Sequence, residues 1–171
     1  DLQKLPERIE GYDISNISGS DAVGSMVTFV SGKPDKKYYR RFRIKSEEGP
    51  DDYRMLKEVL ERRFKHGKKE IESGEEGKFS KFPDLILIDG GQGQLNAARQ
   101  ILNELNLQGI TIIGLAKKFE AIFKIDWDEP LYLDENSSAL KLIQRVRNEA
   151  HRFAVNYHRR IRQKRTVRSS L

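Results

Sequence analysis

The sequence contains no cysteine, and it holds no long uninterrupted run of apolar residues. Without cysteine the chain has no disulfide, no thiolate nucleophile and no zinc site built on cysteine ligands. No apolar run approaches the ~20 residues that cross a bilayer, and no signal-peptide pattern opens the chain. We therefore expect a cytoplasmic protein, and we predict no membrane partner.

Charge, by contrast, is abundant and unevenly placed: 34% of the residues are charged, and the net charge is +6. Between Arg145 and Arg168 the chain carries nine lysines and arginines but a single acid, Glu149. Each phosphate that such a cation neutralises releases counterions, so this stretch favours a polyphosphate partner such as nucleic acid. The alternative interpretation is a solvated helix face that continues into a basic tail.

The first half of the chain is predicted to form strands followed by one helix. The segments IEGYDISNIS, MVTFV and YYRRFRI are rich in β-forming residues, and turn residues such as SGKPDK separate them. An amphipathic helix is predicted to begin near Pro50 and to end at Gly67, because acids occupy its first turn and apolar residues recur at helical spacing. The polar segment 68–82 is predicted to be an exposed loop.

The second half alternates strands and helices. In order, we expect a strand at 85–88, a helix at 92–105, a strand at 110–115, a short hairpin at 122–125 and 131–133, and a long helix capped by Ser137 or Ser138. Three hairpin-linked strands followed by parallel ones predict an α/β fold with a mixed five-stranded sheet, flanked by helices and with a small extra hairpin. This order is typical of a ribonuclease-H-like fold, although other α/β folds share it. We expect one domain, residues 1–171.

Two aspartates occupy positions where a chemical site is plausible on an α/β sheet. Asp13 lies inside a strand pattern, and Asp89 ends the most apolar strand directly before two glycines. The carboxyl ends of strands are where α/β folds build their sites. An aspartate near a strand end is also an ordinary turn former, which is the structural alternative. Asp51 and Asp52 open a helix, where helix capping explains them as well as function does.

Histidine is the other candidate ligand type. His151 lies beside the apolar stripe of the last helix, where a lone histidine is more often structural than functional, and His66 and His158 carry less weight. Carboxylates that share one surface repel each other unless a cation compensates, and such sites suit Mg²⁺ or Mn²⁺. An ion of this kind can activate water and stabilise charge on a phosphoryl oxygen. The residues are therefore compatible with a phosphodiesterase that acts on nucleic acid.

The glycine-rich segment GGQGQ offers a different function, a phosphate-binding loop at a helix N-terminus. It lacks the Gly-Lys-Ser/Thr ending of a nucleotide-binding loop, and Asn96 stands where a dinucleotide fingerprint requires its third glycine. Nucleotide binding is therefore the weaker interpretation. No Gly-x-Ser-x-Gly elbow is present, so acyl transfer is unsupported.

Five motifs in order resemble one known family. They are PERIEGYDISNISGSDAVGSMVTF, YYRRFRIKSEEGPDDYRMLKEVLERRF, PDLILIDGGQGQLNAA, GLAKKFEAIF and LIQRVRNEAHRFAVNYHRRIR. Together they resemble the C-terminal endonuclease half of UvrC, the incision subunit of bacterial nucleotide excision repair. The resemblance runs from Leu5 to Arg165.

The resemblance implies a ribonuclease-H-like endonuclease that uses a divalent metal to cut damaged double-stranded DNA on the 5′ side of a lesion. It also implies a bacterial cytoplasmic setting and partnership with UvrB through a segment absent from this chain. Full-length members carry a GIY-YIG nuclease before this part and a helix-hairpin-helix pair after it, so we expect the chain to be a fragment.

The resemblance also assigns roles to single residues. Asp13 and Asp89 are implied to be metal ligands, and His151 is implied to complete the site as a third ligand or as a proton-transfer group. Asp52 is implied to assist them. Asn148 stands where the motif usually has an aspartate, three positions before His151, and we interpret this change as tuning of the site.

Nearby basic residues are candidates for phosphate contacts, with ordinary surface charge as the alternative. They are Lys117, Lys118, Arg147 and Arg152. The motifs do not determine whether Mg²⁺ or Mn²⁺ is used, or whether one or two ions act. Two other functions stay open: a nucleic-acid-binding module with a decayed site, and a ribonuclease or structure-specific resolvase of the same fold.

Overall fold

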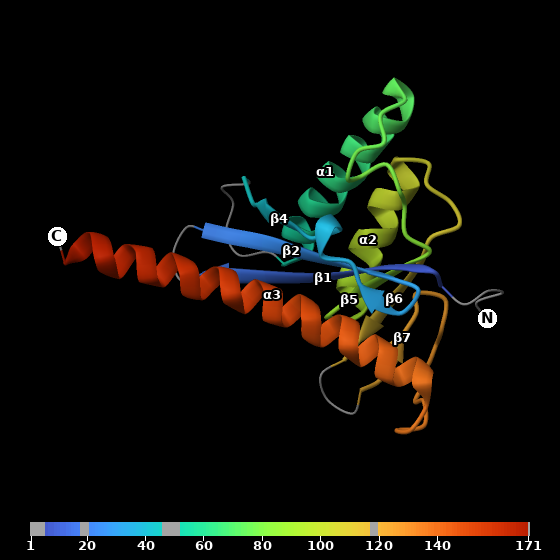
Figure 1. The fold of residues 1–171 in the computed structure, drawn as a ribbon. Helices are drawn as coiled ribbons and strands as arrows, with labels where there is room; N and C mark the ends of the chain where they lie inside the picture. Colours follow the sequence, from blue (N-terminus) through green and yellow to red (C-terminus); the bar gives the residue numbers. More distant parts are fainter. Residues whose placement is uncertain (1–5, 18–20, 46–51, 117–119, 171) are drawn as a thin grey trace.

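The computed structural model describes residues 6–17, 21–45, 52–116 and 120–170 (Figure 1). Its strands are β1 (Arg8–Ile17), β2 (Asp21–Val30), β3 (Lys33–Pro34), β4 (Arg40–Arg43), β5 (Leu85–Ile88), β6 (Thr111–Leu115) and β7 (Ile122–Phe123). Its helices are α1 (Asp52–Ser73), α2 (Gln92–Glu104) and α3 (Ser138–Ser169), with a short 3₁₀ turn at Lys36–Tyr38. Within these described residues, no helix is long and apolar enough to cross a membrane.

All seven strands belong to one mixed sheet. The order is β3-β2-β1-β5-β6-β7, and β4 pairs with the first half of β2. β1, β5 and β6 run parallel to one another, whereas β2 and β7 are antiparallel to their neighbours. The predicted mixed α/β sheet is confirmed. It is wider than five strands because the two-residue strands β3 and β7 extend it at both edges.

The helices form a layer on each side of the sheet (Figure 1). One core cluster joins the sheet to α1 and α2 and includes Leu56, Leu60 and Leu95. A second cluster joins the opposite face to α3 and includes Val146 and Ala150. Side chains alternate between these faces along each strand, because successive residues of a strand point to opposite sides. Tyr12 thus belongs to the first cluster, and its neighbours on β1 face α3.

The predicted end of α1 at Gly67 is wrong, because the helix continues to Ser73. A Cβ at Gly67 would lie 2.4 Å from the carbonyl oxygen of Phe79, so the glycine allows the following segment to lie against the helix. Glu70, one turn later, is buried, and its carboxylate accepts a hydrogen bond of 2.9 Å from the Phe79 backbone N–H. Residues 68–73 are therefore helical, and the loop of the prediction is shorter than expected.

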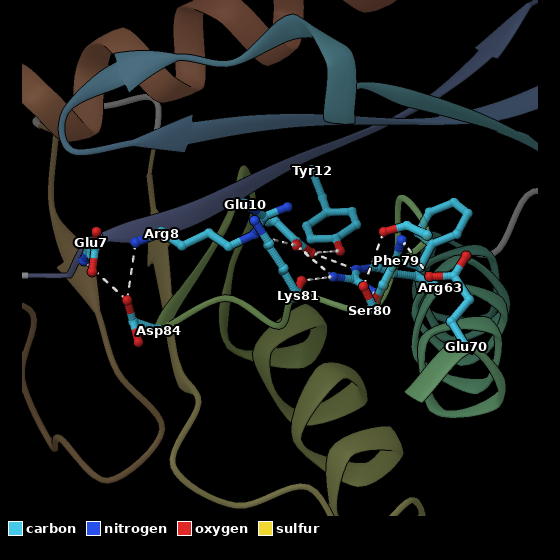
Figure 2. Close-up of polar contacts among 11 residues, drawn as sticks. Glu7, Arg8, Glu10, Tyr12, Arg63, Glu70, Phe79, Ser80, Lys81 and Asp84 are labelled. Atoms are coloured by element: carbon cyan, nitrogen blue, oxygen red, sulfur yellow. Dashed lines mark hydrogen bonds and ion pairs between the residues drawn. The ribbon is translucent and has the colours of Figure 1, made fainter. Parts of the chain in front are cut away.

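A buried ion pair links α1, β1 and this returning segment (Figure 2). The Arg63 guanidinium donates to both carboxylate oxygens of Glu10 at 2.8 Å, and both side chains are 0% exposed. The same guanidinium donates to the backbone oxygens of Phe79 and Lys81, and Tyr12 donates its hydroxyl to Glu10 at 2.7 Å. Burial raises the pKa of Tyr12 well above its ordinary value, so this hydroxyl keeps its proton. The network aligns β1 immediately before Asp13.

Helix α3 lies across the other face of the sheet, and its last turns run past the sheet edge (Figure 1). Ser137 caps it, since the hydroxyl accepts a hydrogen bond of 3.1 Å from the Leu140 backbone N–H. Its fully buried residues are Leu140, Val146, Ala150 and Ala154. A Cβ at Gly11 would lie 2.6 Å from Val146 Cγ1, so this glycine lets the helix approach β1 closely. That close approach brings the middle of α3 over Asp13.

Candidate active site

The pairing of β1 with β5 places Asp13 beside Asp89. The two strands are parallel, and the last pair in their register joins Tyr12 to Ile88, so the next position in each strand direction is an aspartate. Tyr12 and Ile88 both point into the cluster under α1 and α2. By strand alternation, Asp13 and Asp89 point to the opposite face, which α3 covers. The two carboxylates predicted from sequence are thus brought together on one face.

His151 approaches the same place from α3. Its Nδ1 lies 3.2 Å from Oδ2 of Asp13, and this contact connects residues 138 positions apart in the sequence. The imidazole is 63% exposed and the Asp13 side chain 12% exposed, so the histidine covers the carboxylate while its other edge is open to solvent. With a proton on Nδ1 donated to Asp13, the Nε2 atom carries a lone pair. The histidine therefore has one oriented nitrogen and one available nitrogen.

A cavity of about 380 Å³ opens next to this pair. It is lined by Asp89, Glu120, Arg147, Asn148 and His151. The cavity collects one carboxylate from the end of β5, one from the segment after β6 and three polar side chains from adjacent turns of α3. Its wall contains acidic and basic side chains together, so groups of both charges are present at one opening.

Glu120 is the wall residue that we did not predict from sequence. Its carboxylate accepts hydrogen bonds from the side chains of Gln144 and Arg147, one turn apart on α3. Its φ of 49° is in the left-handed region, which non-glycine residues seldom adopt. One signal was present: Glu120 lies in the segment between β6 and β7, which begins at the carboxyl end of β6, and Asp89 lies at the carboxyl end of the parallel strand β5.

The four predicted phosphate contacts have different positions. The Arg147 guanidinium donates to Glu120 at 3.4 Å and to Oδ1 of Asn148 at 3.2 Å, so it lines the cavity while bonded to its neighbours. Arg152 is exposed beside His151 and donates through Nε to Glu149 at 3.0 Å. This bond from Arg152 holds the pKa of Glu149 below its ordinary value. Lys117 and Lys118 lie outside the described residues.

Asp52 is exposed at the first turn of α1. Within the described part of the chain, the structure records no hydrogen bond or ion pair between Asp52 and the predicted ligands. Its neighbour Tyr53 packs on Gly93, which places the start of α1 beside the start of α2, just after Asp89. Asp52 therefore lies at the same end of the sheet as Asp89, but it takes no part in the contact between Asp13 and His151.

The other two histidines differ from His151. His66 forms an ion-pair contact of 3.2 Å with Glu70 on α1, on the opposite face of the sheet. His158, two turns after His151, is near enough to Asp13 and Arg162 for their charges to act on it. Burial, together with Arg162, lowers the pKa of His158, so the neutral imidazole is favoured.

The donor atoms fit a divalent ion in kind: carboxylate oxygens suit Mg²⁺ and Mn²⁺, and the softer imidazole nitrogen favours Mn²⁺ of the two. In this structure, however, the donor atoms are farther apart than the ligands of a single ion. Over the ranges that the structure describes, no three histidine, aspartate or glutamate side chains are close enough to share one ion. Because His151 is mostly exposed, its ring has room to turn toward the carboxylates.

Comparisons with known proteins agree on one family. Residues 1–155 match the family model described as the UvrC RNAse H endonuclease domain. UvrABC system protein C of Dehalococcoides mccartyi is 56% identical over 170 residues, which is 99% of this chain and 28% of that protein. The corresponding protein of Chlorobaculum tepidum is 50% identical over 170 residues, 99% of this chain and 26% of that protein. The chain thus spans less than a third of the length of these relatives.

Two solved structures are distantly similar to this chain. Endonuclease V of Ciona intestinalis, in complex with a DNA that contains an inosine, is 18% identical with a TM-score of 0.45, covering 66% of this chain and 46% of that chain. Argonaute of Marinitoga piezophila is 16% identical with a TM-score of 0.42, covering 74% of this chain and 19% of that chain. With TM-scores below 0.5, these likenesses are too distant to bear on the site.

Proposed function

Because this chain belongs to the UvrC RNase H endonuclease family, we propose that it is a divalent-metal-dependent endodeoxyribonuclease. It would hydrolyse a phosphodiester bond of DNA and leave a nick. One observation carries the proposal: Asp13 and Asp89 stand side by side on the sheet face under α3, and His151 contacts Asp13 at 3.2 Å. Two carboxylates and an imidazole that lie this close together support a metal-binding role and a proton-transfer role for these residues.

Asp13, Asp89 and His151 would hold Mg²⁺ or Mn²⁺. When bound, such an ion polarises the phosphate and lowers the pKa of an attacking water. The two carboxylates supply negative charge on one sheet face, which an ion would compensate. The Nε2 atom of His151 faces solvent rather than Asp13, so either coordination or acceptance of a proton from water would use that nitrogen.

Basic side chains around the cavity would hold the DNA strand. Arg147 can exchange its bonds to Glu120 and Asn148 for a phosphate, because a guanidinium binds phosphate through two parallel donors. Arg152, Lys117 and Lys118 would contact flanking phosphates, and Asp52 would assist from the start of α1. A carboxylate in place of Asn148 would bind Arg147 more tightly, so the amide leaves this arginine easier to release.

In the wider proposal, the chain makes the incision on the 5′ side of a lesion during nucleotide excision repair. Its substrate would be damaged double-stranded DNA, its protein partner UvrB, and its location the bacterial cytoplasm. The support is the likeness to UvrABC system protein C, which the chain matches over 99% of its own length but 28% of the relative's. Partner binding and lesion choice are therefore proposals for a larger protein that contains this chain.

The test is nicking of supercoiled plasmid by the chain with Mn²⁺, Mg²⁺ or EDTA. The Asp13→Asn and Asp89→Asn variants keep the shape of each side chain and remove one negative charge. We expect metal-dependent nicking by the unaltered chain, and at least a hundredfold loss in each variant, on the order of a lost transition-state contact. An Asp126→Asn variant serves as the matched control, because this exposed carboxylate pairs with Arg99 away from the cavity.

Nicking that persists in both site variants would contradict the assignment of Asp13 and Asp89. Nicking that survives EDTA would contradict the role of a metal. His151→Gln separates the two histidine roles: a ligand role predicts a higher metal requirement, whereas a proton-transfer role predicts a changed pH profile at saturating metal.

A further inference from the structure

Asp89 and Asp13 are neighbours on adjacent strands, and the same row of paired positions continues across β2 to Arg41 on β4. Asp13 pairs with Ser25 on β2, and Ser25 pairs with Arg41 on β4. All of these positions face α3, since their neighbours Tyr12, Met26 and Phe42 belong to the cluster on the opposite face. Neighbouring strands are about 4.8 Å apart, so the Arg41 backbone lies about 10 Å from that of Asp13. Ser25 between them is 1% exposed.

Aromatic rings of α3 hold the Arg41 guanidinium in place. It lies over the Phe153 ring at 3.7 Å from the ring centroid and 5.0 Å from that of Tyr157. Phe153 is in turn held by an edge contact with Tyr39, with the ring centroids 5.2 Å apart. One donor, Nη2, reaches the Phe153 backbone oxygen at a long 3.4 Å. Stacking on these rings orients the planar guanidinium. The hydrogen bond to Phe153 uses only one of its donors.

Among the residues that the structure describes, no acid pairs with the charge of Arg41. Its Nε is buried and makes no hydrogen bond, and in the ranges that the structure describes no carboxylate forms an ion pair with Arg41, Arg43 or Arg160. Burial lowers the pKa of Arg41, and the nearby charge of Arg160 lowers it further. Arg160 is three positions after Tyr157 on α3, so it lies on the same side of the helix as the ring that Arg41 contacts. Like charges at neighbouring positions repel each other, and an anion that binds both would relieve that repulsion.

We propose that Arg41 and Arg160 form a binding subsite for a backbone phosphate of the DNA strand, about 10 Å from the candidate cleavage centre. The subsite rests on the proposed function for its substrate, and it adds the direction in which the strand leaves the cavity: across β2 toward β4. Arg41 offers a fixed, planar set of donors, and Arg160 adds charge from the exposed face of α3. A phosphate can accept hydrogen bonds from both cations at once.

The test measures DNA binding without catalysis. Binding of a short fluorescein-labelled duplex is followed by anisotropy in EDTA, with the salt concentration varied between about 50 and 200 mM. The variants are Arg41→Gln and Arg160→Gln. Arg160 is exposed on a helix, so its variant keeps the fold even where the loss of stacked Arg41 lowers stability. Lys69→Gln is the matched control, since it removes one exposed positive charge from α1 on the other face of the sheet.

Each site variant should reduce the slope of log K against log salt by about 0.9, which is about an eightfold loss of affinity at about 0.1 M salt. Lys69→Gln should leave the slope unchanged. Unchanged slopes in both arginine variants would overturn the subsite, as would an equal effect of the control or an absence of DNA binding by the unaltered chain.

The two experiments can contradict the subsite and the proposed function independently of each other. Asp13→Asn should keep the full slope in EDTA while losing plasmid nicking. Normal nicking together with unchanged slopes overturns the subsite alone, and reduced slopes without any nicking by the unaltered chain support the subsite and contradict the nuclease.

Discussion

Among single residues, Arg63 is the fully buried cation on which the first half of the fold depends. Its guanidinium neutralises Glu10 and satisfies the backbone oxygens of Phe79 and Lys81. Arg63→Ala would leave a buried carboxylate uncompensated and two carbonyls without donors. Removing one partner of a buried pair costs about 3–5 kcal/mol. We expect a loss of that size in the free energy of unfolding, measured by urea denaturation.

Lys65, two positions later, provides the control for that experiment. It forms an exposed helical pair with Glu61 at 2.5 Å, and the two side chains are 56% and 44% exposed. Exposed ion pairs contribute about 0–1 kcal/mol, so Lys65→Ala should cost much less than Arg63→Ala. Similar losses in the two variants would contradict the importance of the buried network.

His158 is the residue for which the structure predicts a pH dependence of stability. Its pKa is lowered by burial and by Arg162, while the charge of Asp13 opposes the shift. The unfolded chain therefore binds more protons than the folded chain just below the ordinary histidine pKa of about 6.5, and stability falls as the pH drops through that range. His158→Gln should lose less stability than the unaltered chain between about pH 7.5 and 5. Identical losses in urea denaturation at the two pH values would contradict this cause.

Among the elements, α1 depends on a glycine that would be unfavourable in an isolated helix. Gly67→Ala removes a helix-weakening residue, which alone would stabilise by about 1 kcal/mol. In this fold the added Cβ would lie 2.4 Å from the Phe79 carbonyl oxygen, which is backbone and cannot turn away. We expect a net loss of about 1–3 kcal/mol because the segment after the helix must shift. Thermal unfolding would measure it.

Gly93→Ala in α2 is the matched control for this prediction. The added Cβ would lie 2.7 Å from the ring of Tyr53, but this neighbour is the far end of a side chain rather than backbone, and Tyr53 is 51% exposed. The helix preference of alanine should therefore decide the sign, and Gly93→Ala should be neutral or stabilising. A stabilising Gly67→Ala would show that the Phe79 segment is not held against α1.

At the scale of the whole molecule, metal binding at the candidate site should appear as thermal stability. A ligand that binds only the folded chain stabilises by about 2.7 kcal/mol at a concentration of about 100 Kd. For a chain of this size that corresponds to a rise in Tm of about 5–10 °C. Mn²⁺ should give this rise, EDTA should reverse it, and Asp89→Asn should abolish it, as followed by calorimetry.

Asp126→Asn again serves as the control, because Asp126 lies near the beginning of β6 and the candidate site lies near its end. It should keep the full rise in Tm. An equal rise in Asp89→Asn would mean that the ion binds elsewhere on the molecule.

Local sequence patterns were sufficient to predict most of the elements. The apolar run before Asp89 predicted β5, and the helical spacing around Val146 predicted the buried side of α3, both of which the structure confirms. Patterns failed at Gly67, where the sequence signal for a helix end concealed a packing contact with a segment twelve residues later. The signal for a helix end is a property of the local sequence. Close packing instead depends on which distant segments lie against the helix.

The sequence by itself determined the family, the alternation of elements and the presence of two aspartates and a histidine of the right kinds. Only the tertiary structure decided that these residues lie near one another, because the register of β1 with β5 and the approach of α3 over Gly11 are contacts between distant parts of the chain. The same long-range pairing recruited Glu120 to the cavity and Arg41 to the row beyond Asp13. Periodicity reports which face a residue occupies, but pairing between distant segments determines its neighbours.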